Sequence, residues 1–206
     1  MKDDREYRSM DLMVSADEEK NYKVEGYAST FEPYTLFTDE NGTEYKEQIL
    51  PTAFDEADLS DVVFRVDHTG RVYARSSAGT VELWTDEHGL GQRADLSKTQ
   101  KARELFEDIE AGNYPKMSFA FRVAEDRFDK ATHTRVISRI AKVYDVSPVS
   151  FPANPGTNLC VSTRDYFNGV IEIEKAERLE EEKRERLKQK IKLLTEVSYG
   201  TQRHEH

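Results

Sequence analysis

Gly112-Asn-Tyr-Pro-Lys-Met-Ser-Phe-Ala-Phe-Arg-Val123 is the stretch from which the fold can be worked out. Its second half alternates, and the apolar side chains share one face of a predicted strand: Met117, Phe119, Phe121 and Val123. Ser118 lies on the opposite face. A small polar residue can simply fill a surface position there, but a rigid strand is also where a reactive hydroxyl is best positioned. The position alone leaves both interpretations open.

The segment before this stretch has the signature of a helix. Ser97 can cap it, Gly112 can end it, and the apolar stripe comprises Ala102, Leu105, Phe106 and Ile109. We therefore predict a helix over residues 97–111 that leads directly into the Ser118 strand.

Short alternating segments on both sides predict further strands. They cover residues 22–31, 62–66, 79–84, 91–96, 134–140 and 143–151. Residues 32–48 instead carry many acidic side chains and an Asn-Gly turn, which indicates a long surface excursion, and residues 49–59 hold a short helix at best. Strands joined by hairpin turns predict an α+β protein that is mainly β, with an antiparallel sheet closing into a barrel or sandwich and helices packed outside.

The composition limits the classes of protein. A formal net charge of -10 and a pI near 5.1 argue against a surface for nucleic acid, which favours positive charge. A single cysteine, Cys160, excludes an internal disulfide framework and fits a reducing compartment. The sequence begins without the apolar core of a signal peptide and has no run of about 18 apolar residues. We therefore expect a soluble, cytosolic protein with no membrane partner.

The charge is concentrated near the C-terminal end. From Glu172 to Lys192, 15 of 21 residues are charged, and a thin apolar stripe at helical spacing comprises Leu179, Leu187, Ile191 and Leu194. Such a segment is either a solvated helix or partly disordered tail, or an amphipathic helix that pairs with a partner helix or a scaffold coiled coil. We expect three parts: a polar arm over residues 1–20 that is either mobile or a first edge strand, a main domain over 21–164 and this tail over 165–206.

Among the histidines, His68 is the strongest candidate for chemistry. It ends an apolar strand and precedes Thr-Gly, whereas His88 and His133 lie in predicted turns, where histidine is mostly exposed. No HExxH motif and no pair of CxxC motifs is present, so no metal site is predicted. A Gly-rich phosphate loop and the GxSxG elbow of α/β-hydrolases are also missing.

A serine becomes a nucleophile when an imidazole within hydrogen-bond reach takes its proton and a carboxylate orients that imidazole. Ser118, His68 and Asp145 come from three separate strand-like segments, so a sheet can bring them together. Asp145 lies in a β-branched run, where a carboxylate is an unusual residue to bury unless something pairs with it. The three residues form a candidate triad that spacing alone does not prove.

These segments, in this order, resemble the prohead (capsid maturation) proteases of tailed bacteriophages. The resemblance rests on His68 at the end of a strand, on Met117-Ser-Phe-Ala-Phe121, and on Asp145-Val-Ser-Pro-Val149 followed by Pro152-Ala-Asn-Pro155. Supporting pieces are Gly26-Tyr-Ala-Ser-Thr-Phe31, Leu50-Pro-Thr-Ala-Phe54 and the segment from Gly79 to Leu90. It covers about residues 22 to 160.

The resemblance implies a serine endopeptidase with the herpesvirus-assemblin-like fold, an antiparallel β-barrel ringed by helices, so that residues 21–164 would be a protease domain. By position, Ser118 is the nucleophile, His68 the general base and Asp145 the residue that orients His68, where the family often has Glu. The backbone near residues 147–149 is where the family geometry suggests the oxyanion hole. No cofactor is implied, and Cys160 is the weaker alternative nucleophile.

The resemblance also implies partners and a location. Such enzymes lie inside the immature capsid (prohead) in the host cytoplasm, cleave the scaffold protein or the scaffolding segment of the major capsid protein, and cut themselves. Relatives gain activity on dimerising, which implies a homo-oligomer such as a dimer. The alternative is a catalytically inactive capsid-assembly or scaffold-binding protein of the same fold, which would show no self-cleavage.

Overall fold

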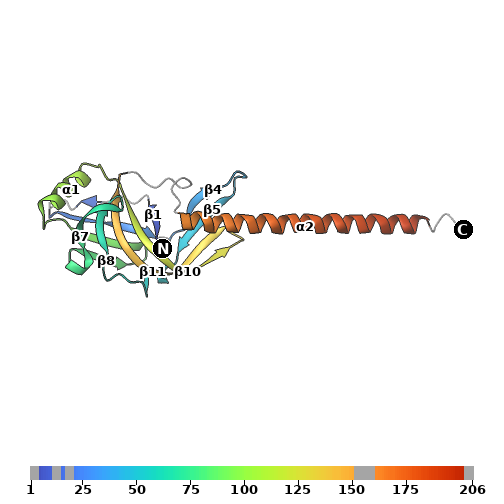
Figure 1. Cartoon of the computed structure of the whole chain (residues 1–206), viewed down its shortest axis with the longest axis horizontal. Helices are drawn as coiled ribbons and strands as arrows, with labels where there is room; N and C mark the ends of the chain where they lie inside the picture. Colours follow the sequence, from blue (N-terminus) through green and yellow to red (C-terminus); the bar gives the residue numbers. More distant parts are fainter. Residues whose placement is uncertain (1–4, 11–14, 17–20, 151–160, 202–206) are drawn as a thin grey trace. The chain divides into compact units, whose positions relative to one another are not determined.

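The computed structural model describes residues 5–10, 15–16, 21–150 and 161–201, and it divides into two units (Figure 1). One unit ends at residue 160 and the other begins at residue 161. Among the described residues, the first unit is mainly β with one α-helix, and the second is a single long helix. The coarse prediction of a mainly β protein with helices is therefore confirmed.

Two sheets make up the first unit. The main path of the larger sheet has the strand order β1 (Glu6–Met10), β10 (Lys116–Asp129), β11 (Thr134–Val149), β5 (Glu44–Ile49) and β4 (Tyr34–Thr38). Two further strands of this sheet branch from β11: β6 (Val63–Val66) pairs with β11, and β7 (Thr69–Arg75) pairs with β6. The smaller sheet has the order β2 (Ser15–Ala16), β3 (Lys23–Thr30), β9 (Gly89–Asp95) and β8 (Val81–Thr85). Short 3-10 helices lie at Pro51–Phe54 (η1) and Ser76–Ala78 (η2).

The predicted sheet needs two corrections. Its strands are not all antiparallel, because β5 and β6 both pair with β11 in parallel. β11 has 16 residues, so two short strands can share its edge, β5 along Thr134–Ile137 and β6 at Asp145–Val146. The two sheets also do not join into a closed ring among the described strands, so the predicted barrel is not confirmed.

One apolar core lies between the sheets and the helix α1 (Gln100–Glu110). Phe119 and Phe121 on β10 stack at 4.4 Å within it. The predicted stripe of α1 is buried as expected, and Gly112 follows the helix at a φ of 83°, where glycine is favoured. The predicted cap is wrong: the Thr99 hydroxyl, not Ser97, accepts the Ala102 N–H.

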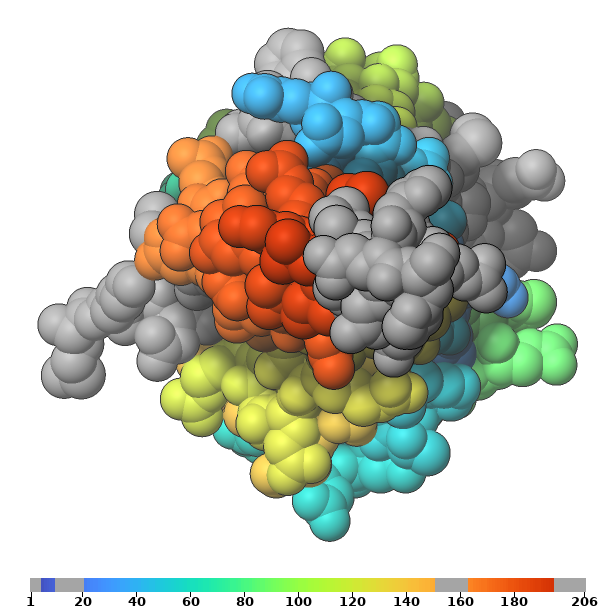
Figure 2. Space-filling view, turned by 90° about the vertical axis from the view of Figure 1, so that its right-hand side faces the viewer, coloured from blue at the N-terminus to red at the C-terminus, as the bar shows by residue number. Residues whose placement is uncertain are grey.

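The expected surface excursion at residues 32–48 is wrong as well, because this segment forms the β4–β5 hairpin. Only the predicted Asn-Gly turn is present, where Gly42 adopts a φ of 84°. Tyr45, Glu47 and Ile49 alternate inward along β5 and are buried. The turn of this hairpin (light blue) and the turn between β10 and β11 (yellow) both reach the face shown in Figure 2.

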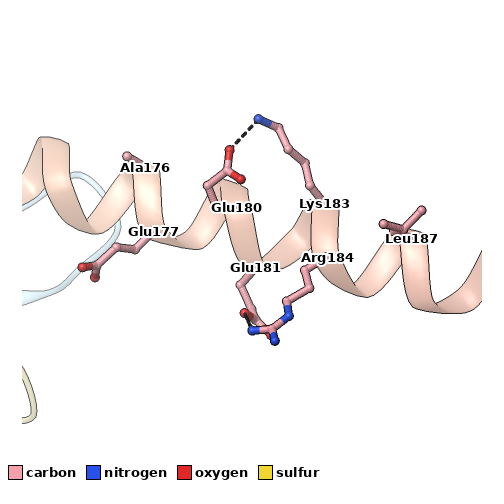
Figure 3. Close-up of a pocket in the computed structure, with 7 residues that line it drawn as sticks. All are labelled: Ala176, Glu177, Glu180, Glu181, Lys183, Arg184 and Leu187. Atoms are coloured by element: carbon pink, nitrogen blue, oxygen red, sulfur yellow. Dashed lines mark hydrogen bonds and ion pairs between the residues drawn. The ribbon is translucent and has the colours of Figure 1, made fainter.

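The second unit is α2 (Val161–Thr201), so the charged tail is a helix over its described residues. The members of its apolar stripe are exposed, with 52% for Leu179 and 62% for Leu194. Figure 3 shows those side chains between Ala176 and Leu187 that line a hollow on the helix surface, and ion pairs join Glu180 to Lys183 and Glu181 to Arg184. The hollow beside them is lined by side chains of this helix alone, so it is a surface feature rather than an enclosed site.

Candidate active site

Ser118 lies one strand in from the β1 end of the larger sheet. It belongs to β10, between β1 and β11, and is opposite Ser9 on one neighbour and Ser147 on the other. Because β10 alternates, the apolar residues on both sides of Ser118 in sequence enter the core while its hydroxyl points to the other face. Ser118 has no exposed surface in this structure.

His68 lies at the tip of the β6–β7 hairpin. Val66 pairs with Thr69, so only Asp67 and His68 form the turn, with φ values of 48° and 58°. Two positive φ angles are typical of the tight turns whose twist matches the flanking strands. The turn is held to the end of β11, because the Asp67 carboxylate accepts hydrogen bonds from the Ser150 N–H and hydroxyl at 2.9 and 2.8 Å.

Asp145 lies on β11, where it pairs with Ala120 of β10 and Val63 of β6. It is 2% exposed, so its carboxylate needs partners inside the protein. The Ser147 hydroxyl donates to Asp145 Oδ1 at 2.7 Å, from the same face of β11 two residues on. The same oxygen lies 2.6 Å from His68 Nδ1.

The structure thus brings the three predicted residues into one chain of contacts. His68 Nε2 lies 2.7 Å from Ser118 Oγ, and His68 Nδ1 lies 2.6 Å from Asp145 Oδ1. These distances allow a proton to pass from the hydroxyl to the imidazole while the carboxylate selects the tautomer of the ring. The sheet pairing of β6 with β11 places the hairpin of His68 beside the other two strands.

A fourth group contacts the serine. The Ser118 hydroxyl donates to the carbonyl oxygen of Arg8 on β1 at 2.7 Å. One hydroxyl hydrogen serves one acceptor at a time, so this carbonyl competes with His68 Nε2 for the proton. The ring of Tyr7, also on β1, meets the His68 ring edge-on at 4.7 Å between centroids.

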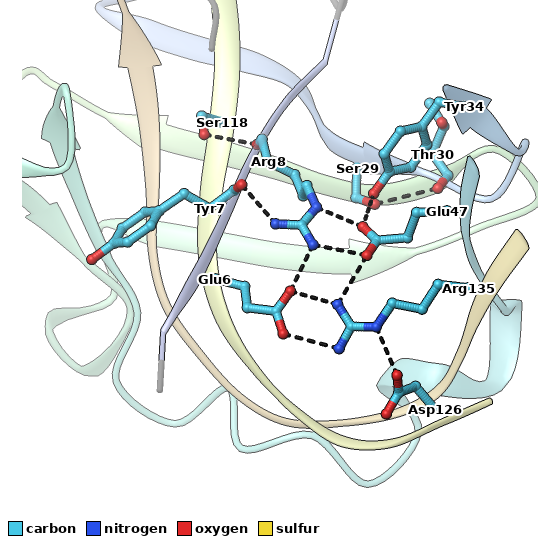
Figure 4. A network of polar contacts seen from close by, with 10 residues as sticks. All are labelled: Glu6, Tyr7, Arg8, Ser29, Thr30, Tyr34, Glu47, Ser118, Asp126 and Arg135. Atoms are coloured by element: carbon cyan, nitrogen blue, oxygen red, sulfur yellow. Dashed lines mark hydrogen bonds and ion pairs between the residues drawn. The ribbon is translucent and has the colours of Figure 1, made fainter. Parts of the chain in front are cut away.

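On the opposite face of β1, two arginines and two glutamates form a buried network (Figure 4). Arg8 and Glu6 of β1 meet Glu47 of β5 and Arg135 of β11. Burial alone would lower the pKa of Arg8, but the carboxylates of Glu47 and Glu6 outweigh it and hold this pKa well above its usual value. Burial and Glu47 likewise raise the pKa of Tyr34, whose hydroxyl donates to Glu47.

Other residues named from the sequence lie apart from this group. His88 follows β8 in a turn of the smaller sheet, and His133 precedes β11 at the end remote from Asp145. Cys160 and the segment from residue 152 to 155 lie outside the described residues. Within the suggested oxyanion segment 147–149, Pro148 has no N–H to donate.

No role at the site was predicted for Asp67, for Arg8 or for the side chain of Ser147, whose backbone alone was suggested for the oxyanion hole. Asp67 and Ser147 each had a weak signal, since one precedes His68 directly and the other follows Asp145 on the same face of its strand. Arg8 had no such signal in the sequence. It contacts Ser118, 110 positions away, through its carbonyl oxygen, a group that every residue carries. Among the described residues, no group of acidic, histidine or cysteine side chains is arranged to hold a metal ion, and no helix is long and apolar enough to cross a bilayer.

Comparison with known protein families identifies a family for this chain. The family model described as caudovirus prohead serine protease matches residues 10–170, well over half of the chain and including the three residues above. No curated protein and no solved structure matches the chain.

Proposed function

The chain belongs to the caudovirus prohead serine protease family, and we propose that it is a serine endopeptidase with Ser118, His68 and Asp145 as its catalytic residues. The observation that carries this proposal is the contact chain of 2.7 Å and 2.6 Å from the hydroxyl through the imidazole to the buried carboxylate. Family membership supports the reaction class, and the contacts support the assignment of residues.

In the proposed reaction, Ser118 Oγ attacks the carbonyl carbon of a peptide bond while His68 Nε2 takes the hydroxyl proton. Asp145 keeps the other ring nitrogen protonated and stabilises the imidazolium that forms. The C–N bond then breaks, and His68 returns the proton to the leaving amine. Water, deprotonated by His68, attacks the resulting ester, which releases the acid product and restores the hydroxyl.

We further propose the biological setting that the family suggests. The substrate is the scaffold protein or the scaffolding segment of the major capsid protein, with self-cleavage, inside the immature capsid in the host cytoplasm. The catalytic part corresponds to residues 21–164 with the herpesvirus-protease type of fold, and the tail over 165–206 contacts scaffold. Activity in a homo-oligomer such as a dimer belongs to the same proposal.

Replacing the nucleophile is the direct test. Ser118→Ala should lower cleavage of the capsid precursor on the order of 10⁴-fold or more, as loss of a triad nucleophile does. Ser138→Ala, at a serine on β11 whose hydroxyl donates to the Glu125 carbonyl, is the matched control and should cleave normally. Near wild-type processing by Ser118→Ala would contradict the assignment.

One observation favours the alternative of an inactive scaffold-binding protein. Ser118 is fully covered, and its hydroxyl donates to the Arg8 carbonyl. A fluorophosphonate label separates the two functions, because it bonds only to an activated serine. Labelling of Ser118 and a truncated product absent from Ser118→Ala support the protease, whereas an unlabelled and uncut chain supports the inactive protein.

A further inference from the structure

The strand β1 occupies the place beside Ser118 that a bound peptide would need. β1 is the end strand of the larger sheet, and Ser9 lies directly opposite Ser118 in the pairing with β10. An extended peptide can add to an open sheet edge through the same main-chain hydrogen bonds. Without β1, the edge of β10 would be such an edge and would carry the candidate nucleophile.

β1 also presents one of its own peptide groups to the site. The carbonyl oxygen of Arg8 lies 2.7 Å from Ser118 Oγ, so the peptide group that links Arg8 to Ser9 lies at the nucleophile. Tyr7 packs against the ring of His68. β1 therefore contacts two of the three proposed catalytic residues in the manner of a bound peptide.

The side chains of β1 that face away from His68 are held by charge (Figure 4). The Arg8 guanidinium donates to both oxygens of Glu47, at 2.6 and 2.8 Å. The Glu6 carboxylate accepts two hydrogen bonds from Arg135, at 2.7 and 3.0 Å. Such paired contacts are the strongest recognition of a charged group.

The two residues that hold β1 do not belong to it. Glu47 comes from β5 and Arg135 from β11, and both are buried, at 0% and 4% exposed. If β1 leaves, Glu47 keeps its hydrogen bonds from Arg135 and Tyr34 but loses both hydrogen bonds from Arg8. Arg135 likewise keeps its bond to Asp126 but loses both bonds to Glu6. Each position then favours a new partner of the same charge as the one it has lost.

We propose that the β10 edge is the peptide-binding site of this protein and that β1 is its internal occupant, an inference that rests on the proposed protease function. A substrate strand replaces β1 and places a basic residue where Arg8 lies, directly before the bond that is cut. It places an acidic residue where Glu6 lies, two positions earlier. Glu47 and Arg135 determine this specificity, so the substrate is a peptide with the pattern acidic-x-basic.

The first experiment weakens the occupant in the full-length chain. Arg8→Ala removes both hydrogen bonds to Glu47, so the open state gains population and a fluorophosphonate should label Ser118 about tenfold faster than in the wild type. Arg8→Lys keeps the positive charge but loses the planar guanidinium that bonds to both oxygens of Glu47, so it should be labelled at an intermediate rate. This variant also tests the inference if Arg8→Ala does not fold. Arg93→Ala breaks an exposed ion pair with Glu25 in the smaller sheet and should leave the rate unchanged.

The second experiment tests the specificity. A peptide with the sequence of residues 4–12, Asp-Arg-Glu-Tyr-Arg-Ser-Met-Asp-Leu, is added to Arg8→Ala before the label. It should protect Ser118 at a concentration about tenfold lower than a peptide with Glu in place of its second Arg. In the double variant Arg8→Ala, Glu47→Gln, the two peptides should protect equally, because the carboxylate that distinguishes them is gone.

The outcomes separate this inference from the function on which it rests. Equal labelling rates in the wild type and both Arg8 variants, or equal protection of Arg8→Ala by the two peptides, would overturn the inference while leaving the protease assignment intact. No labelling in any variant that circular dichroism shows to be folded, together with an uncut capsid precursor, would contradict the catalytic proposal and this inference with it.

Discussion

His68 adopts a backbone conformation that residues with a side chain seldom use. Its φ is 58° and that of Asp67 is 48°, in the left-handed region. The turn is held in this conformation from two sides. Asp67 accepts two hydrogen bonds from Ser150 on the neighbouring segment, and Arg65 of β6 donates to the carbonyl oxygens of His68 and Gly70. Strained residues of this kind are found where a site needs a side chain in one place.

At the scale of single residues, we predict that Asp67 positions His68. Asp67→Gly keeps the left-handed turn but loses the bonds to Ser150, so kcat should fall about tenfold or more with little change in KM, since small displacements of a base are costly. Asp67→Asn preserves both the turn and the hydrogen-bonding capacity and should remain close to the wild type. Steady-state kinetics on the capsid precursor or a peptide derived from it, with thermal melts of all three proteins, would measure this. An equal loss for Gly and Asn would point to the charge instead of the hydrogen bonds.

At the scale of the element, a single carboxylate stabilises the turn that joins two strands of the smaller sheet. The turn between β8 and β9 is closed by Asp86, whose carboxylate accepts hydrogen bonds from the N–H groups of His88 and Gly89 and from the hydroxyl of Tyr27. The bond from Tyr27, followed by those from the turn, lowers the pKa of Asp86 to about 2. This turn therefore depends on a charged carboxylate.

At the scale of the element, we predict an acid-sensitive hairpin. The pKa of Asp86 is about 2 in the folded protein and about 3.9 when unfolded. Its contribution to stability is therefore complete above about pH 4 and is lost as the pH falls toward 2. Urea unfolding midpoints at pH 5, 4 and 3 should fall less steeply for Asp86→Asn than for the wild type. Glu87→Gln removes a neighbouring charge without these bonds and should retain the wild-type slope; equal slopes for all three would refute the prediction.

The two units of the chain have different physical characters. The unit up to residue 160 has a continuous apolar core, while the charged part of α2 exposes large apolar side chains, including Leu187 at 58% and Ile191 at 55%. Exposed apolar side chains at helical spacing are typical of a helix that binds a partner helix.

At the scale of the whole molecule, we predict that α2 recruits the protein and takes no part in the chemistry. Deleting everything after Arg164 should leave cleavage of a peptide substrate unchanged and should abolish incorporation into proheads. Changing Leu187 and Leu194 to Ser in the full chain should reduce incorporation in the same direction, whereas Gln189→Ser should not. Proheads purified from infected cells, analysed by mass spectrometry, give the measurement, and normal incorporation of the deleted chain would exclude this role.

The three candidate residues could be identified from the sequence because they lie in or beside strands with recognisable patterns. The alternation around Ser118, the end of the strand before His68 and the β-branched run around Asp145 are local patterns, and each survives in the fold. It missed β4 and β5 because Glu47 interrupts the apolar pattern of β5. A buried carboxylate is tolerable there only because Arg8, 39 positions away, neutralises it.

The sequence by itself indicated most of the strands and the helix α1, and it offered Ser118, His68 and Asp145 as candidates, because hydrophobic alternation and side-chain chemistry are local properties. Only the tertiary structure decided how those segments pair. The parallel pairing of β6 with β11, the hydrogen bond of Ser118 to the Arg8 carbonyl and the neutralised charges behind β1 all join residues far apart in the chain. Strand pairing is made by backbone groups that every residue carries, so the residue types alone do not encode the choice of neighbour.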